Sequence, residues 1–112
     1  MKRYCLALDL KDDPTLIEEY EHWHKSENGW PEIKESIISA GITAMEIYRV
    51  ANRLFMIMET DDTFDFAKKA ALDAHNPKVQ EWETLMWKFQ QPLPSAAPGD
   101  KWLLMDKIFQ LP

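Results

Sequence analysis

The order of strand-like and helix-like segments along the chain limits its fold more than any other feature of the sequence. Alternating apolar residues predict a first strand over residues 4–10, and two apolar segments separated by a short turn predict a hairpin over residues 44–50 and 53–59. Residues 91–100 contain three prolines and a glycine, which predicts a loop. A last strand is expected over residues 102–111, so the chain offers four strands.

Helical segments fill the two long gaps between these strands. Pro14 suits the first turn of a helix, the acidic residues before it favour the helix N-terminus, and Gly41 suits the end of a second helix. Asp62 or Thr63 is expected to cap the third helix. The predicted helices cover residues 14–24, residues 30–40, a segment that ends at Ala74, and residues 78–89.

One strand, helices, two strands, helices and a final strand make the ferredoxin-like split βαβ pattern. We therefore expect an α+β fold in a single domain over residues 1–112, with a four-stranded antiparallel sheet and its helices on one face. The other face also carries apolar side chains, which a partner subunit or a ligand must cover. A homodimer of the dimeric α/β-barrel type is the expected assembly.

Composition narrows the classes of partner. A net charge of -6 disfavours binding to nucleic acids and to anionic membranes, which leaves a neutral or cationic small molecule or a protein. The one cysteine, Cys5, cannot form an internal disulfide and is expected to be a small buried apolar residue. No apolar run approaches the roughly 20 residues that span a bilayer, and no signal peptide is recognisable. A cytoplasmic location is expected.

Tyr20 and His24 are the first candidates for chemistry. Four residues apart on a helix, they share one face, where a phenol beside an imidazole can orient a hydroxylated ligand and move a proton. The alternative is a partly buried histidine on an amphipathic helix. His22 points to the opposite side, which argues against a metal pair, and no metal site is expected. His75 lies at a helix break and is expected to be solvated.

Aromatic residues form the second informative group, because the chain has five tryptophans. Aromatic planes pack against the C–H faces of sugars, and indole N–H groups reach hydroxyls. Core packing is the alternative for at least half of them. The tryptophans near the first helix break and before the proline-rich loop are Trp23, Trp30, Trp82 and Trp87. The methionines Met45, Met56, Met58, Met86 and Met105 are expected to fill the core.

Several short motifs, in their order and spacing, resemble the L-rhamnose mutarotase family over nearly the whole chain. They are Glu18-Glu19-Tyr20-x-x-x-His24, Trp30-Pro31-Glu32, Gly41, Ile47-Tyr48, Asn52-x-Leu54-Phe55, Gln80-x-Trp82-x-x-x-Met86 and the ending Ile108-Phe109-Gln110-Leu111-Pro112. The resemblance implies a ferredoxin-like dimer that needs no cofactor and interconverts the α and β anomers of L-rhamnose. A related branch is similar to L-fucose mutarotases, so both 6-deoxy-L-hexoses remain candidate substrates.

The resemblance also assigns roles to three residues. The family's proton-donating histidine falls on His24, its sugar-contacting tyrosine on Tyr20 and its sugar-contacting tryptophan on Trp82. An imidazole suits the reaction because its ordinary pKa, about 6.5, lets it take and give a proton near neutrality. The expected mechanism has His24 protonate the ring oxygen as general acid and remove that proton on ring closure. Tyr20 holds a hydroxyl, and Trp82 packs on the sugar's apolar face and methyl group.

Three departures from the family pattern concern the expected pocket wall. Met45 stands where the family has a tyrosine, Glu83 where it has a second tryptophan, and the loop over residues 25–29 is longer by two residues. Glu83 is therefore a candidate substrate-binding residue that binds a hydroxyl or helps to take the anomeric proton. These departures leave the reaction in place and the choice of sugar open.

Two other functions fit the same residues. A ferredoxin-like dimer with an open face rich in tryptophan and methionine also suits a dimeric α/β-barrel monooxygenase or a haem-binding protein, in which His24 is a base or an axial ligand. A non-catalytic sugar-binding domain is the second alternative, since one fold serves many functions. It predicts sugar binding without faster anomer exchange.

Overall fold

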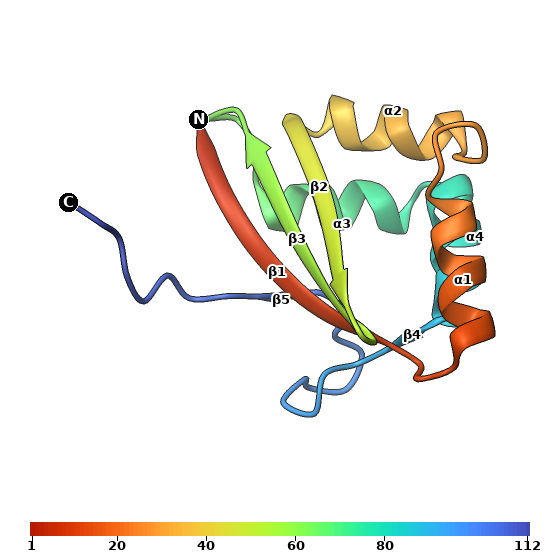
Figure 1. Cartoon of the computed structure of the whole chain (residues 1–112). Helices are drawn as coiled ribbons and strands as arrows, with labels where there is room; N and C mark the ends of the chain where they lie inside the picture. The colour runs from red at the N-terminus through yellow and green to blue at the C-terminus, as the bar shows by residue number, and fades with distance from the viewer.

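Four helices cover one face of an antiparallel sheet, and the last residues of the chain run away from the body of the protein (Figure 1). The computed structural model describes residues 1–112. Along the chain lie β1 (Lys2–Leu10), α1 (Pro14–Trp23), α2 (Pro31–Ser39), β2 (Ile42–Val50), β3 (Arg53–Thr60), α3 (Phe66–Ala74), α4 (Pro77–Trp87), β4 (Gln90–Gln91) and β5 (Leu103–Leu104). No helix has the length and apolar character needed to cross a membrane.

The sheet confirms the predicted α+β, ferredoxin-like arrangement, but its last strand differs from the prediction. The three long strands lie in the order β2-β3-β1, and both β4 and β5 pair with β1, all antiparallel. The predicted strand over residues 102–111 is wrong in extent, because only Leu103 and Leu104 pair with β1. After the N–H of Met105 donates to the carbonyl of Cys5, the chain leaves the sheet. Local strand propensity is not enough to form a strand where no neighbouring strand continues the pairing.

Helix ends follow the predicted capping chemistry with one exception. The Asp13 carboxylate caps α1, and a proline occupies the first turn of α1, α2 and α4. The cap of α3 is Asp65, so the prediction of Asp62 or Thr63 is wrong. The Asp61 carboxylate instead accepts bonds from the N–H and hydroxyl of Thr63, which forms a turn before the helix. The helix therefore starts later than predicted.

Gly41 confirms the predicted end of α2. Its φ is +99°, in the left-handed region, and a Cβ at this position would lie 2.6 Å from Oδ1 of Asp61. Only glycine fits this close approach without displacing that side chain. The turn brings β2 back to the sheet directly after the helix.

Two buried clusters fill the space between the sheet and the helices. One contains Leu6, Ile42, Met56, Met58 and Phe64, and the other contains Leu10, Tyr20, Leu54, Met86 and Phe89. Three of the methionines are thus core residues as predicted, but the prediction is wrong for Met105, which is 48% exposed. Cys5 is only half-buried, because it points to the open face of the sheet.

Apolar side chains are exposed both on the open face of the sheet and in the C-terminal segment. On the open face, Tyr48 and Val50 are exposed, and their neighbours Phe55 and Ile57 are only half-buried. In the C-terminal segment, Ile108, Phe109 and Leu111 are exposed by 95%, 74% and 80%. These surfaces have no partner within one chain.

Candidate active site

A cavity of about 420 Å³ lies between the helices and the covered face of the sheet. Its volume is within the range of about 300–1,000 Å³ that is typical of small-ligand sites. Each of three helices lines it with side chains at helical spacing, which places them on one inward stripe. The stripes are Ile33, Ser36 and Ile37 on α2; Phe66, Lys69, Ala70 and Asp73 on α3; and Val79, Trp82, Glu83 and Met86 on α4.

Tyr20 and His24 line the same cavity from the end of α1. Their ring centroids are 4.2 Å apart, so the predicted helical pairing is present. Nδ1 of His24 lies 2.8 Å from the carbonyl oxygen of Tyr20. A carbonyl can only accept, so we assign the proton to Nδ1. This hydrogen bond leaves the lone pair on Nε2 free to accept a proton.

Burial shifts the pKa of both groups in the direction that favours the neutral form. It lowers the pKa of His24 below its ordinary 6.5, and the hydrogen bond to the Tyr20 carbonyl acts in the opposite direction. The neutral imidazole is thereby favoured, although His24 as a residue is exposed to solvent. Burial raises the pKa of Tyr20 to about 12, with an opposing contribution from the Gln90 side chain. Tyr20 thus stays protonated and can donate or accept a hydrogen bond.

Trp82 completes a cluster of aromatic rings around His24. Its ring centroid lies 5.7 Å from that of His24, 5.2 Å from that of Trp30 and 6.4 Å from that of Trp23, all edge to face. Such T-shaped contacts favour a fixed ring orientation. The cluster holds Trp82 in the cavity wall beside the imidazole.

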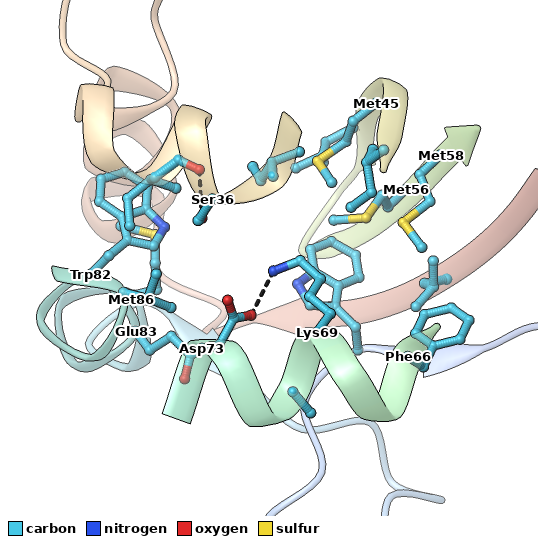
Figure 2. A pocket seen from close by; sticks show the side chains of 18 of the residues that line it. Ser36, Met45, Met56, Met58, Phe66, Lys69, Asp73, Trp82, Glu83 and Met86 are labelled. Carbon is cyan, nitrogen blue, oxygen red and sulfur yellow. Dashed lines mark hydrogen bonds and ion pairs between the residues drawn. The ribbon is translucent and has the colours of Figure 1, made fainter. Parts of the chain in front are cut away.

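Two of the three family departures lie in the cavity wall. Figure 2 shows Met45 on β2 and Glu83 on α4, both among the lining residues. The loop over residues 25–29 contributes no lining residue, so its predicted place in the wall is wrong. The Lys101 ammonium donates to the backbone carbonyl of Glu83 at 3.4 Å, and burial lowers the pKa of Lys101.

Several polar residues of the cavity were not predicted from the sequence. They are Ser36, Lys69, Asp73 and Gln90. Lys69 and Asp73 carry a recognisable signal, because a charged pair at i,i+4 lies on the stripe that also carries the apolar residues Phe66 and Ala70. Gln90 carries no such signal, since it reaches the cavity only because β4 pairs with β1.

The remaining histidines lie outside the cavity, as predicted. His22 is exposed near Asn28, and His75 ends α3 at the surface. No three His, Cys, Asp or Glu side chains lie close enough together to hold a metal ion.

A sequence model of L-rhamnose mutarotase matches residues 3–111. The chain belongs to this family. An L-fucose mutarotase of Xanthomonas campestris pv. campestris is 49% identical over 111 residues, covering 99% of this chain and 89% of that protein. A UPF0734 protein of Dictyostelium discoideum is 41% identical over 117 residues, covering 98% of this chain and 90% of that protein.

Solved structures agree on the fold. The crystal structure of an L-rhamnose mutarotase from Formosa agariphila superposes with a TM-score of 0.71 at 20% identity, and tetracenomycin F2 cyclase from Streptomyces glaucescens with 0.66 at 16% identity. Both comparisons cover 100% of each chain. Family membership makes this chain an isomerase that acts on a carbohydrate and interconverts sugar anomers.

Proposed function

We propose that this chain is an L-fucose mutarotase with His24 as its proton-transferring residue. The observation that carries the proposal is the imidazole of His24 between Tyr20 and Trp82 in the cavity wall. The choice of sugar is supported by the 49% identity to an L-fucose mutarotase. L-Rhamnose is the second candidate sugar.

The hydrogen-bonding state of His24 favours a definite order of steps. Nε2 takes the proton of the anomeric hydroxyl, the C1–O1 bond becomes a carbonyl, and the C1–O5 bond breaks with its electron pair on O5. The imidazolium then gives the proton to O5. Because O1 and O5 are attached to the same carbon, one nitrogen can serve both. Rotation about C1–C2 and the reverse steps close the other anomer.

This order refines the mechanism that the family resemblance implies. There His24 acts first as a general acid, whereas a neutral ring with its proton on Nδ1 is prepared to act first as a base. Tyr20 then binds the sugar as a neutral phenol, and Trp82 packs on the apolar face of the ring. Glu83 accepts a bond from a sugar hydroxyl.

We also infer that two chains associate through the open face of the sheet. The exposed apolar side chains of this face and of the C-terminal segment support a second copy as the occupant, since exposed apolar surface favours association. Ile57→Glu, at the centre of the face, is expected to yield monomers in light-scattering chromatography. A dimer of unchanged stability in this variant contradicts the inference.

A cytoplasmic location also fits the chain. Cys5 is a free cysteine, and reducing compartments keep single thiols reduced. Fractionation of cells that express the protein tests the location.

The deciding experiment is NMR saturation transfer between the α and β anomeric protons of L-fucose, L-rhamnose and D-glucose. We expect the wild-type protein to accelerate exchange of L-fucose most and His24→Gln to lose the acceleration. Binding of sugar without faster exchange supports the non-catalytic alternative and contradicts the proposal. A Soret band after addition of haem supports the haem-binding alternative.

A further inference from the structure

One charged pair faces the cavity rather than solvent. Nζ of Lys69 and Oδ2 of Asp73 lie 2.5 Å apart on α3, and their side chains are only 20% and 18% exposed. Both line the cavity that contains His24. Intrahelical pairs at this spacing are common on exposed helix surfaces, where both ions keep their hydration. A largely buried pair loses hydration and contributes little net stability unless further polar groups contact it.

We propose that Lys69 and Asp73 bind the sugar hydroxyls farthest from the anomeric carbon, and that they discriminate between the two configurations at C4. The inference rests on the proposed function, because His24 must face C1 and O5 for the reaction. Atoms C3 and C4 of the ring then extend away from His24. Figure 2 shows Lys69 on α3 well separated from Trp82, whose ring contacts His24, so the pair extends along the cavity away from that contact.

The pair has hydrogen-bonding capacity left for this role. An ammonium carries three donors and a carboxylate two acceptor oxygens. Lys69 uses one donor on Oδ2 of Asp73, and Oδ1 of Asp73 has no hydrogen-bond partner in the protein. A donor and an acceptor therefore stand side by side. Two neighbouring sugar hydroxyls, each able to donate and accept, complement this arrangement.

Other polar groups in the cavity are less suited to these hydroxyls. The Ser36 hydroxyl already donates to the carbonyl of Ile33 at 2.7 Å. Glu83 lines the cavity from α4, and the proposed function already assigns it a sugar hydroxyl. Gln90 lies beside Tyr20, at the α1 end of the cavity. Lys69 and Asp73 remain as the charged groups of the α3 wall.

The wall opposite the pair suits the rest of a 6-deoxy sugar. Figure 2 shows Lys69 and Asp73 rising from α3 into the cavity, with Met45, Met56 and Met58 on the sheet side. Methionine side chains offer apolar contact for the methyl group that replaces the C6 hydroxymethyl in these sugars. One wall thus binds hydroxyls and the other binds the methyl group.

The configuration at C4 gives a direct test. L-Fucose has its C4 hydroxyl axial and cis to that at C3, whereas its C4 epimer, 6-deoxy-L-glucose, has an equatorial C4 hydroxyl. A pair fixed on one helix cannot follow the hydroxyl to both positions without losing a hydrogen bond. The wild-type protein is therefore expected to have a KM for L-fucose about tenfold or more below that for the epimer.

Variants of the pair separate recognition from structure. Asp73→Asn is expected to raise KM for L-fucose about tenfold or more, with kcat within about threefold of wild type, because a charged acceptor is lost. The double variant Lys69→Met, Asp73→Leu keeps the volume of the wall and removes both charges. It is expected to lose the preference for L-fucose over the epimer. Circular dichroism melting checks that each variant folds.

The matched control is the exposed pair on α4. Lys78 and Glu81 lie 3.3 Å apart with side chains 54% and 57% exposed, and neither lines the cavity. Lys78→Met, Glu81→Gln is expected to leave KM and sugar preference unchanged. If the double variant of Lys69 and Asp73 behaves like this control, or changes only the melting temperature, the inference is wrong.

Calorimetric titration with L-fucose distinguishes this failure from failure of the proposed function. Exchange that depends on His24 together with unchanged sugar affinity in Asp73→Asn retains the mutarotase and overturns the role of the pair. Sugar binding that Asp73→Asn weakens, without any acceleration of exchange by the wild type, supports the role of the pair and overturns the mutarotase. No binding of L-fucose by the wild type overturns both.

Discussion

The two polar regions of the cavity differ in how they hold charge. At the end of α1, burial lowers the pKa of His24 and raises that of Tyr20, which favours the neutral form of each. On α3, Lys69 and Asp73 form an ion pair. Proton transfer requires a group that is close to changing its protonation state, whereas recognition of hydroxyls requires one that keeps its state. The cavity thus separates the proposed chemistry from the proposed recognition.

The largest effect is expected at the α1 end. His24→Gln keeps a side chain of similar length but removes the nitrogen base, so anomer exchange should slow by about 10²–10⁴-fold. Affinity for L-fucose, measured by calorimetry, should change far less. An equal loss of affinity and rate would show that His24 binds the sugar instead of moving protons, and the contrast between the regions would disappear.

A smaller effect is expected when the aromatic wall next to His24 is removed. Trp82→Ala deletes the ring proposed to pack on the sugar, and KM for L-fucose should rise about tenfold because apolar contact is lost. Trp87→Ala is the matched control, since Trp87 lies on the same helix and does not line the cavity. Equal KM values for the two variants contradict the role of Trp82.

Acid should reduce the activity through the α1 end of the cavity. The lowered pKa of His24 means that protonation, and loss of the base, occurs only below pH 6.5, so exchange should hold from pH 8 to 6.5 and decline at lower pH. The unfolded chain binds this proton more readily, so stability should also fall as pH drops below 6.5. Urea unfolding at several pH values should show this component in the wild type and not in His24→Gln. A rate that declines already above pH 7 contradicts the assignment.

The smallest effect is expected from the phenol. Tyr20→Phe removes one neutral hydrogen-bonding group and keeps the ring that packs against His24 and Phe89. KM should rise by roughly threefold to tenfold, the equivalent of one neutral hydrogen bond. Steady-state exchange kinetics measure this change. A loss as large as that of His24→Gln would indicate that Tyr20 takes part in proton transfer.

Much of the fold and of the α1 end could be predicted from the sequence because both depend on local periodicity. Spacing of four residues is enough to place Tyr20 and His24 on one helical face, and prolines and glycines mark the helix boundaries. The last strand could not be predicted in extent, since pairing with β1 ends after Leu104 whatever the propensity of the residues beyond it. The cap of α3 was missed because Thr63 donates to the Asp61 carboxylate in a turn, so that the helix starts only after Asp65.

The sequence by itself determined the family, the order of the elements and the pairing of Tyr20 with His24 on one helical face, because short-range patterns and motifs carry that information. The tertiary structure alone decided which polar side chains share the cavity. Gln90 lies beside Tyr20 because β4 pairs with β1. Lys69 and Asp73 line the same cavity because α3 packs against α4. These contacts arise from burial of apolar stripes on separate elements. The same burial shifts the pKa values of His24 and Tyr20, since removal of water disfavours their charged forms.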